Sequence, residues 1–345
     1  MRLSLILTTL LLSLTAIAEE QKAVLITGAT SGIGRVAAEH LAEQGYYVYA
    51  GARKDADMEA LNAIDNITAV RLDVTKPEQI AAAVEFIKSE GRGLWGIVNN
   101  AGVNVIAPLV VADEADFQFL FDVNVFGVYR VTKAFAPMVL ESGGRIVNIS
   151  SISGVLTGGG YGMYAASKHA VEAMTDALHR EMDRHGVFVT SVNPGNYASE
   201  IGLSRCKRML SDDNDDNWGL WEERRQQMIT NCREALESDD PIEGASPIGV
   251  ALAIEQALFE DNPRDRYLIV PRQVEAGWTI ARAIEELLAF NNRHEFSYSR
   301  EEIAALIDVM WPYMDGEKSI DDEEQGAELM AFMQAWMNRA ETPAE

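Results

Sequence analysis

The sequence predicts an α/β fold in which helices cover both faces of a parallel sheet, with a helical extension at the C-terminus. Three observations lead to this prediction. Short apolar runs recur up to Pro271, helical patterns separate most of these runs, and only helical patterns follow. Strands that alternate with helices are typical of a doubly wound parallel sheet. At 345 residues the chain is long enough to bury a large core.

The predicted strands are short runs of apolar residues. The first covers residues 23–26, and a glycine-rich turn and a stretch with helical spacing, residues 35–44, follow it. Further strands are expected at residues 48–50, 68–72, 95–98, 145–149, 187–192 and 267–270. Ligands of such sheets bind beyond the carboxyl ends of the strands. Because Gly28, Asn99 and Ser151 lie at or just past strand ends, we expect the functional site there.

The turn after the first strand reads TGATSGIG from Thr27 to Gly34. A strand, a glycine-rich turn and a helix in this order are typical of a dinucleotide-binding Rossmann unit, although such a turn can also be an ordinary loop. Glycines let the backbone approach a pyrophosphate, and the helix N-terminus offers N–H donors and a positive dipole. The residues expected to contact the cofactor here are Thr27, Gly28, Ser31, Gly32, Ile33 and Gly34.

Tyr164 and Lys168 stand four residues apart, and Ser151 precedes the tyrosine by thirteen. Residues i and i+4 share a helix face, so the Lys168 ammonium is expected near the Tyr164 phenol. A free phenol titrates near ~10 and is a poor base at neutral pH, but a nearby cation favours the phenolate. The pattern predicts a tyrosine with a lowered pKa that acts as general acid or base, and a serine hydroxyl that holds the reacting oxygen.

Neighbouring residues offer alternatives for two of these roles. Ser150 competes with Ser151, but successive residues of a strand point to opposite sides, and the spacing to the tyrosine favours Ser151. Tyr161 competes with Tyr164 but has no lysine four residues later. Ser153 is expected to cap a turn rather than to support the substrate.

The end of the second predicted strand bears on the choice of cofactor. NAD enzymes usually place an acidic residue there to bind the ribose hydroxyl, whereas arginine favours the additional phosphate of NADP. Ala52 stands where the acid would be, and Arg53 and Lys54 follow it. We therefore predict a preference for NADP(H), with NAD(H) possible because Asp55 and Asp57 are close. A solvated charge cluster is the alternative interpretation.

These motifs, in this order, resemble the short-chain dehydrogenase/reductase family over about residues 22 to 271. The resemblance implies a catalytic tetrad, in which Lys168 also holds the nicotinamide ribose and Asn124 positions Lys168 through a water molecule. The tetrad residues are Asn124, Ser151, Tyr164 and Lys168. It also implies that Asp73, followed by Val74, contacts the adenine ring. The remaining cofactor contacts that it implies are Asn100, Ala101, Gly102, Tyr164, Lys168, Pro194, Gly195 and Ser199.

The implied reaction transfers a hydride between the nicotinamide and a carbonyl or alcohol carbon. In the family, the segment after Gly195 forms a lid, which is expected here at about residues 196–242. Its apolar residues favour a hydrophobic substrate of retinoid, steroid or fatty type, and its first residues loosely resemble retinol and hydroxysteroid dehydrogenases. Packing between lid helices is the alternative interpretation of the apolar residues. A protein without turnover that binds NADP as a sensor or scaffold is the alternative function.

The first 18 residues have the pattern of a signal peptide: a basic start, an apolar stretch and an A-x-A sequence that ends at Ala18. The alternatives are an uncleaved membrane anchor, a misassigned start codon and an N-terminal packing segment. The pattern suggests export to a secretory or periplasmic compartment, or anchoring with the enzyme facing the cytoplasm. Cys206 and Cys232 can pair across the lid, but two cysteines do not establish a redox compartment.

Residues 272–345 are predicted to form an acidic extension with helices at 274–290, 299–310 and 328–339, the second opened by a capping box at Ser299 and Glu302. The extension holds six Lys and Arg against sixteen Asp and Glu. Its apolar residues are expected to pack on the core or in a homo-oligomer, a dimer or tetramer. The net charge of −24 argues against binding to nucleic acid or anionic membranes. No metal site is predicted, because the acidic run at residues 212–216 lacks the spacing of an EF-hand.

Overall fold

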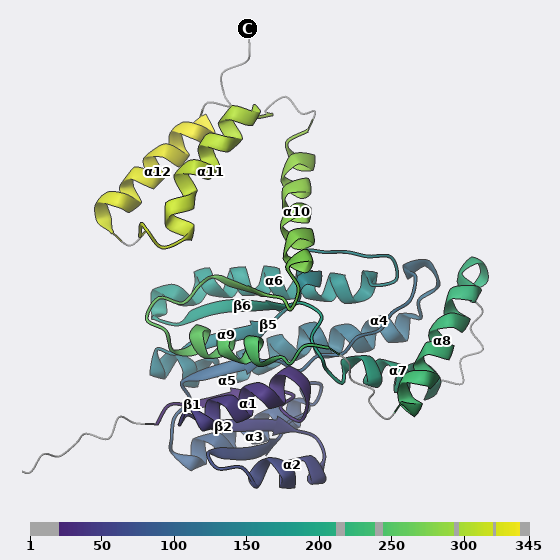
Figure 1. Ribbon diagram of the computed structural model, residues 1–345. Coiled ribbons are helices and arrows are strands. Elements are labelled where there is room, and N and C mark those ends of the chain that lie inside the picture. The colour runs from purple at the N-terminus through teal and green to yellow at the C-terminus, as the bar shows by residue number, and fades with distance from the viewer. Residues whose placement is uncertain (1–20, 212–217, 239–243, 293–296, 320–321, 339–345) are drawn as a thin grey trace, which may run out of the picture. The chain divides into compact units, whose positions relative to one another are not determined.

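A computed structural model describes residues 21–211, 218–238, 244–292, 297–319 and 322–338 (Figure 1). The predicted signal peptide and the acidic run at residues 212–216 lie outside the described residues. The chain divides into two compact units, Met1–Gly277 and Trp278–Glu345.

The first unit contains seven parallel strands in the order β3-β2-β1-β4-β5-β6-β7, which confirms the predicted sheet. The strands are β1 (Ala23–Ile26), β2 (Tyr47–Ala52), β3 (Ile67–Arg71), β4 (Gly96–Asn99), β5 (Arg145–Ile149), β6 (Phe188–Pro194) and β7 (Arg266–Ile269). The strand order reverses between β1 and β4, which pair with each other. Ile26 of β1 lies beside Ala50 of β2 on one side and beside Val98 of β4 on the other. The loops after β1 and β4 therefore meet at the topological switch point, where doubly wound sheets bind ligands.

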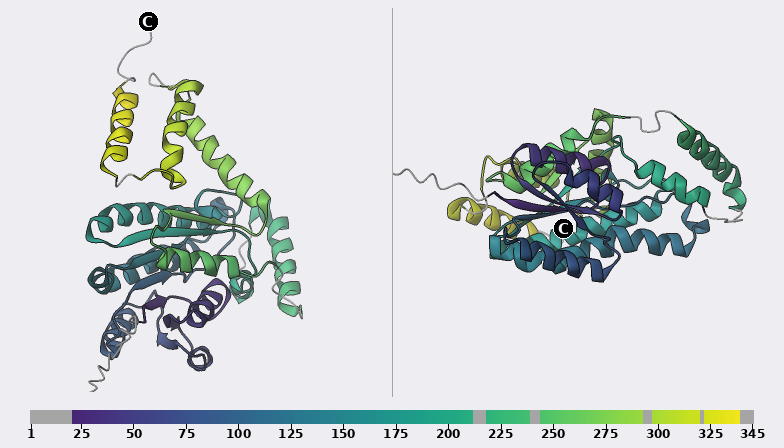
Figure 2. Two further views of the ribbon diagram at one scale, coloured as in Figure 1. Left: turned by 60° about the vertical axis from the view of Figure 1, so that its left-hand side comes forward. Right: turned by 90° about the horizontal axis from the view of Figure 1, so that it is seen from below.

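Helices cover both faces of the sheet (Figure 2), and each face has its own apolar core. Alternate residues of β1 point to opposite faces, so Val24 belongs to one core and Leu25 to the other. The first core includes Leu41 of α1 (Gly32–Glu43) and Ile254 of α9 (Ile248–Phe259), and the second includes Phe135 of α5 (Val128–Ser142). The other helices around the sheet are α2 (Asp55–Asn62), α3 (Pro77–Glu90), α4 (Glu114–Phe121) and α6 (Gly162–Met182).

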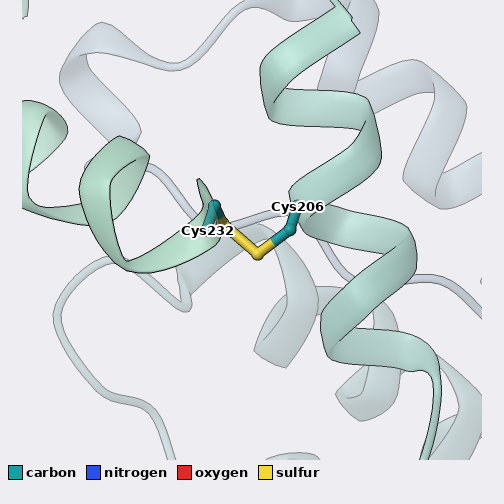
Figure 3. The surroundings of a disulfide bond; sticks show 2 residues. All are labelled: Cys206 and Cys232. Atoms are coloured by element: carbon teal, nitrogen blue, oxygen red, sulfur yellow. A yellow bond between two sulfur atoms is a disulfide. The ribbon is translucent and has the colours of Figure 1, made fainter. Parts of the chain in front are cut away.

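The predicted lid region contains two helices, α7 (Ile201–Ser211) and α8 (Glu222–Glu237). Cys206 of α7 and Cys232 of α8 are joined by a disulfide bond, which links the two helices directly (Figure 3). Both cysteines are buried. The pairing that the sequence left open is therefore present in the structure.

The second unit is helical. Helix α10 (Gln273–Phe290) begins in the first unit, and α11 (Arg300–Met314) and α12 (Glu323–Asn338) belong to the second. The predicted capping box is present, because the Ser299 hydroxyl accepts from the Glu302 N–H and the Glu302 carboxylate accepts from Ser299. The rings of Tyr298 and Trp336 stack with their centroids 3.9 Å apart, which ties α12 to the start of α11.

Two boundaries in the second unit differ from the prediction. Helix α12 starts at Glu323 rather than at residue 328, and two glutamates in its first turn are favourable at the positive end of the helix dipole. Helix α11 continues beyond residue 310 through Pro312 to Met314. None of the helices in the described part of the chain is both long and apolar enough to span a bilayer.

Candidate active site

The carboxyl end of β5 brings Ser151 to helix α6, which carries Tyr164 and Lys168. Ser151 caps a short 3-10 turn, Ile152–Gly154, and its Oγ accepts a hydrogen bond of 3.0 Å from the Ser153 N–H. The Ser151 side chain also lies near enough to the Tyr164 phenol to lower its pKa. Two of the predicted tetrad residues are thus neighbours, and Ser153 belongs to the turn that Ser151 caps.

Lys168 lies one helical turn after Tyr164 and is almost completely buried. Its Nζ donates a 2.8 Å hydrogen bond to the Ile149 carbonyl and lies 5.8 Å from the centroid of the Tyr164 ring. Burial lowers the pKa of the Lys168 ammonium from 10.5 to about 8, and the nearby Glu172 carboxylate opposes this shift. The ammonium is therefore still the main form at neutral pH.

Tyr164 differs from the expectation of a lowered pKa. Burial raises the pKa of its phenol to about 12, the nearby Ser151 side chain lowers the pKa only in part, and Tyr161 raises it further. The Lys168 ammonium bonds to a carbonyl instead of the phenolic oxygen, so desolvation prevails. At neutral pH Tyr164 is thus a protonated phenol, which is the form that can donate a proton.

Asn124 lies in a π-helical turn, Asp122–Gly127, between α4 and α5. Its Oδ1 accepts from the Val103 N–H at 2.8 Å, and its Nδ2 donates to the Val103 carbonyl at 2.9 Å and to Ser167 Oγ at 3.1 Å. A Cβ at Gly102 would lie 3.5 Å from Asn124 Oδ1 and 3.8 Å from Lys168 Nζ. Asn124 thus fixes the loop after β4 beside the lysine.

The loops after β1 and β4 are locked together by hydrogen bonds. The Thr27 hydroxyl accepts from the N–H groups of Asn100 and Ala101, both at 3.0 Å, and Asn100 Nδ2 donates to the carbonyls of Thr27 and Gly28. Gly28 has φ +64°, and a Cβ there would come within 2.9 Å of Ala101 Cα. A Cβ at Gly34 would collide with Asn100 Nδ2 and the Gly28 carbonyl. Only glycine therefore permits this approach of the two loops.

The start of α1 fits a phosphate group. Ser31 is the N-cap residue, but its side chain makes no capping hydrogen bond, so its hydroxyl is available to a ligand. Gly32 has φ +55°, and a Cβ there would lie 3.3 Å from Ser199 Cβ, so the predicted contact residues Gly32 and Ser199 are neighbours. The side chain of Ile33, another predicted contact residue, packs against the core. The free N–H groups of the first turn and an available hydroxyl suit an anion.

The predicted residues for the adenosine end lie at the ends of β2 and β3. Arg53 and Lys54 are exposed, and the Arg53 carbonyl accepts a 2.7 Å hydrogen bond from Arg71. Arg71 lies opposite Ala52 in the sheet and forms an ion pair with Asp55. Arg71 is the last residue of an apolar strand and places a third cation near Arg53 and Lys54. Sequence reasoning did not single out this residue.

Asp73 and Val74 follow β3, and the side chains of both make contacts within the protein. Asp73 Oδ1 accepts from Thr75 N at 2.9 Å and from Thr75 Oγ1 at 2.7 Å, which orients the carboxylate. Val74 is buried, and a Cβ at Gly127 would collide with it. The turn at residues 73–75 is therefore held in a fixed conformation.

Pro194 is the last residue of β6 and Gly195 follows it, and a buried carboxylate holds the backbone beyond them. Glu275 is completely buried, its Oε2 accepts from the Asn196 N–H at 3.0 Å, and its Oε1 pairs with Arg272 at 2.6 Å. Burial acts to raise the pKa of Glu275, but these hydrogen bonds outweigh it and keep the pKa below its usual value. Sequence reasoning missed this residue, because Glu275 is 79 residues from Asn196.

A second buried carboxylate was also missed. Glu172 Oε1 accepts from Asn193 Nδ2 at 2.6 Å, and Oε2 accepts from Arg266 Nε at 2.9 Å. Asn193 Nδ2 also donates to the Ser151 carbonyl at 3.2 Å. The only sequence signal was its position four residues after Lys168, on the same helix face.

A sequence model described as short chain dehydrogenase matches residues 22–208. The chain belongs to the short-chain dehydrogenase family. Retinol dehydrogenase 16 of Homo sapiens is 34% identical over 266 residues, which cover 74% of this chain and 81% of the relative. This agrees with the resemblance drawn from the motifs.

Two further proteins are similar to this chain over different fractions of its length. An uncharacterized oxidoreductase of Escherichia coli K12, YbbO, is 42% identical over 177 residues, or 51% of this chain and 65% of the relative. The chain thus spans slightly less than two thirds of that relative. The solved structure of ElxO with NADP bound has 25% identity and a TM-score of 0.57, with 72% of this chain and 96% of that chain covered. This short-chain dehydrogenase is thus similar in fold to a nucleotide-bound protein.

Proposed function

We propose that this short-chain dehydrogenase is an NADP-preferring oxidoreductase that interconverts a carbonyl and an alcohol, with Tyr164 as the general acid or base. The observation that carries the proposal is the placement of Ser151 and the buried Lys168 ammonium beside the Tyr164 phenol, with Lys168 Nζ 5.8 Å from the centroid of the tyrosine ring. A phenol that is protonated at neutral pH is suited to give its proton to a carbonyl oxygen.

The chain's own groups provide the proton chemistry. Ser151 Oγ accepts from the Ser153 N–H, which leaves the serine proton free to donate to the reacting oxygen. Tyr164 gives its proton to that oxygen as the carbonyl becomes an alcohol, and takes it back in the reverse direction. The Lys168 ammonium lies 5.8 Å from the centroid of the Tyr164 ring, so the phenolate that is left has a positive charge nearby. Asn124 holds the backbone beside Lys168 and is a positioning residue.

The nucleotide fits the cradle formed by Gly28, Gly32 and Gly34, where a Cβ would fill the space or strain the backbone. When bound, a nicotinamide cofactor supplies or accepts the hydride. The start of α1 with Ser31 would hold its pyrophosphate, and Arg53, Lys54 and Asp73 would hold its adenosine end. The preference for NADP rests on the exposed cations and on the absence of an acid at Ala52.

The substrate is proposed to have an apolar part. Tyr164 packs against a buried apolar cluster that includes Val105, Ala107, Met163 and Trp218. The similarity to a protein named retinol dehydrogenase agrees with an apolar substrate. No observation on the described residues favours the alternative of a silent sensor. A homo-oligomer, and membrane association through an uncleaved N-terminus, stay predictions.

The test is the Tyr164→Phe variant of the purified protein. Turnover of NADPH with carbonyl substrates should fall by a factor of about 10²–10⁴, the usual worth of general acid–base catalysis. NADPH binding, measured by fluorescence titration, should be unchanged, because the substitution removes only the hydroxyl. Activity that stays within a few-fold of the wild type would contradict the role of Tyr164.

A further inference from the structure

A cavity lies between the loop after β4 and the helices of the lid region. Its lining includes Asn104 and Val105 of the loop, Arg205 and Met209 of α7, and Trp218. The lining is mixed, because it contains apolar side chains as well as charged groups. None of the tetrad residues lines this cavity.

Two polar atoms of the lining are buried without a hydrogen-bond partner: Arg205 Nε and Asn104 Oδ1. Across the described residues only six buried side-chain polar atoms lack a partner, and two of the six belong to residues that line this cavity. A buried donor or acceptor without a partner costs about 1–3 kcal/mol, more where the group is charged. Such a pair is expected where a ligand supplies the missing partners.

The other charges of the cavity are already engaged. Arg208 donates to Asp116 Oδ1 at 2.8 Å through Nε, and Arg225 pairs with Glu222 at 3.4 Å. The remaining acid, Asp113, accepts from the Ala115 N–H as the N-cap of α4. For Arg205 the described part of the chain contains neither an ion pair nor a hydrogen bond from its side chain.

The cavity shares its apolar wall with the candidate active site. Val105, Met209 and Trp218 line the cavity and belong to the apolar cluster against which Tyr164 packs. The loop that precedes Tyr164 is also fastened to α8, since Arg224 donates to the Gly159 carbonyl at 3.0 Å. The cavity and Tyr164 therefore border the same apolar cluster, which suits a ligand with an apolar stretch.

We propose that the substrate is an oxo or hydroxy acid: an apolar chain with the reacting carbon near Tyr164 and a carboxylate bound by Arg205. This rests on the proposed function. A single carboxylate matches the one cation without a partner among the described lining residues, whereas a phosphate dianion would exceed it. Arginine binds carboxylates through two parallel hydrogen bonds, which fixes the orientation of the bound group. Asn104 Oδ1 would accept from a hydroxyl or a water molecule held with the substrate.

The experiment compares the reduction of 7-oxooctanoate with that of its primary amide, which has the same shape and no charge. Wild-type protein should show a kcat/KM about 10- to 100-fold higher for the acid, the usual worth of a hydrogen bond to a charged group. The Arg205→Met variant should lose this preference, with most of the change in KM. Lys207→Met is the matched control, since it removes an exposed cation from the same helix, and it should keep the preference.

A binding measurement separates this proposal from the proposed function. Octanoate binding to the same proteins, followed by calorimetry, should weaken at least about 10-fold in Arg205→Met and be unchanged in Lys207→Met. Binding with this pattern in a protein that reduces neither ketone would support the carboxylate site and contradict the reaction. Equal kcat/KM for acid and amide, or equal losses in the two variants, would overturn the carboxylate site while leaving the reaction intact.

Discussion

Replacing Lys168 by methionine is expected to stabilise the protein while abolishing turnover. The pKa of Lys168 falls from 10.5 to about 8 on burial, a difference of about 2.5 units. At about 1.4 kcal/mol per unit, keeping the ammonium charged in the folded protein costs roughly 3 kcal/mol. Methionine has a similar length and no charge, so it removes this term. It also leaves the Ile149 carbonyl without its donor, a loss of about 1–2 kcal/mol.

The net expectation at pH 7 is a gain of about 1–2 kcal/mol in the free energy of unfolding. The gain should depend on pH in a defined direction. The folded pKa of Lys168 is depressed, so between about 8 and 10.5 the unfolded chain binds more protons than the folded one. Wild-type stability then rises with pH through this window, and the advantage of the variant should shrink from pH 7 to pH 10.

Urea denaturation followed by circular dichroism, at several pH values, measures this difference. Lys207→Met serves as the control for removing an exposed lysine and should show no such trend. The reasoning would be refuted by a Lys168→Met variant that is less stable than wild type at pH 7, or by a stability difference that does not change with pH.

Three further predictions concern the site and the lid. Because burial raises the pKa of Tyr164 to about 12, alcohol oxidation, which needs the phenolate, should accelerate about tenfold per pH unit between pH 6 and 8, whereas carbonyl reduction should stay level in initial-rate assays. The Arg53→Ala substitution should weaken NADPH binding about tenfold or more and NADH binding little, as measured by fluorescence titration. Equal losses of affinity for NADPH and NADH would contradict the cofactor preference. Replacing both Cys206 and Cys232 by alanine should lower the urea stability by ~3 kcal/mol, because the disulfide closes a sequence separation of 26 residues, and an unchanged midpoint would contradict this.

The sheet and the cofactor loop were predictable because their signals are local. An apolar run at residues 23–26, the glycines after it and the helical spacing beyond are contiguous in the chain, and the structure has β1 and α1 there. The four-residue spacing of Tyr164 and Lys168 likewise follows from helix geometry alone.

What the sequence could not provide depends on tertiary packing. The pKa of Tyr164 is dominated by desolvation, which arises only when α6 is packed against the rest of the fold. Glu172 acquires Arg266 as a partner across 94 residues, and Glu275 reaches Asn196 across 79. Neither separation leaves a periodic trace in the sequence, so both buried carboxylates were missed.

The π-helical turn at Asp122–Gly127 has a consequence for helix phase. In a regular α-helix each residue advances by about 100°, so positions eleven apart, such as Leu120 and Val131, would point almost the same way. In the structure Leu120 belongs to the apolar cluster beside Tyr164, whereas Val131 belongs to the second of the two apolar cores that pack on the faces of the sheet. The wider turn accommodates an additional residue and offsets the two segments, so one continuous helix serves two cores.

Asn124 stands at this change of phase. Deleting one residue from the turn would bring α4 and α5 back into register and rotate one segment by about 100° relative to the other. Either Leu120 would leave its cluster or Val131 would leave the core. Helix phase therefore constrains the length of this turn, even though five of its six residues have no assigned chemical role.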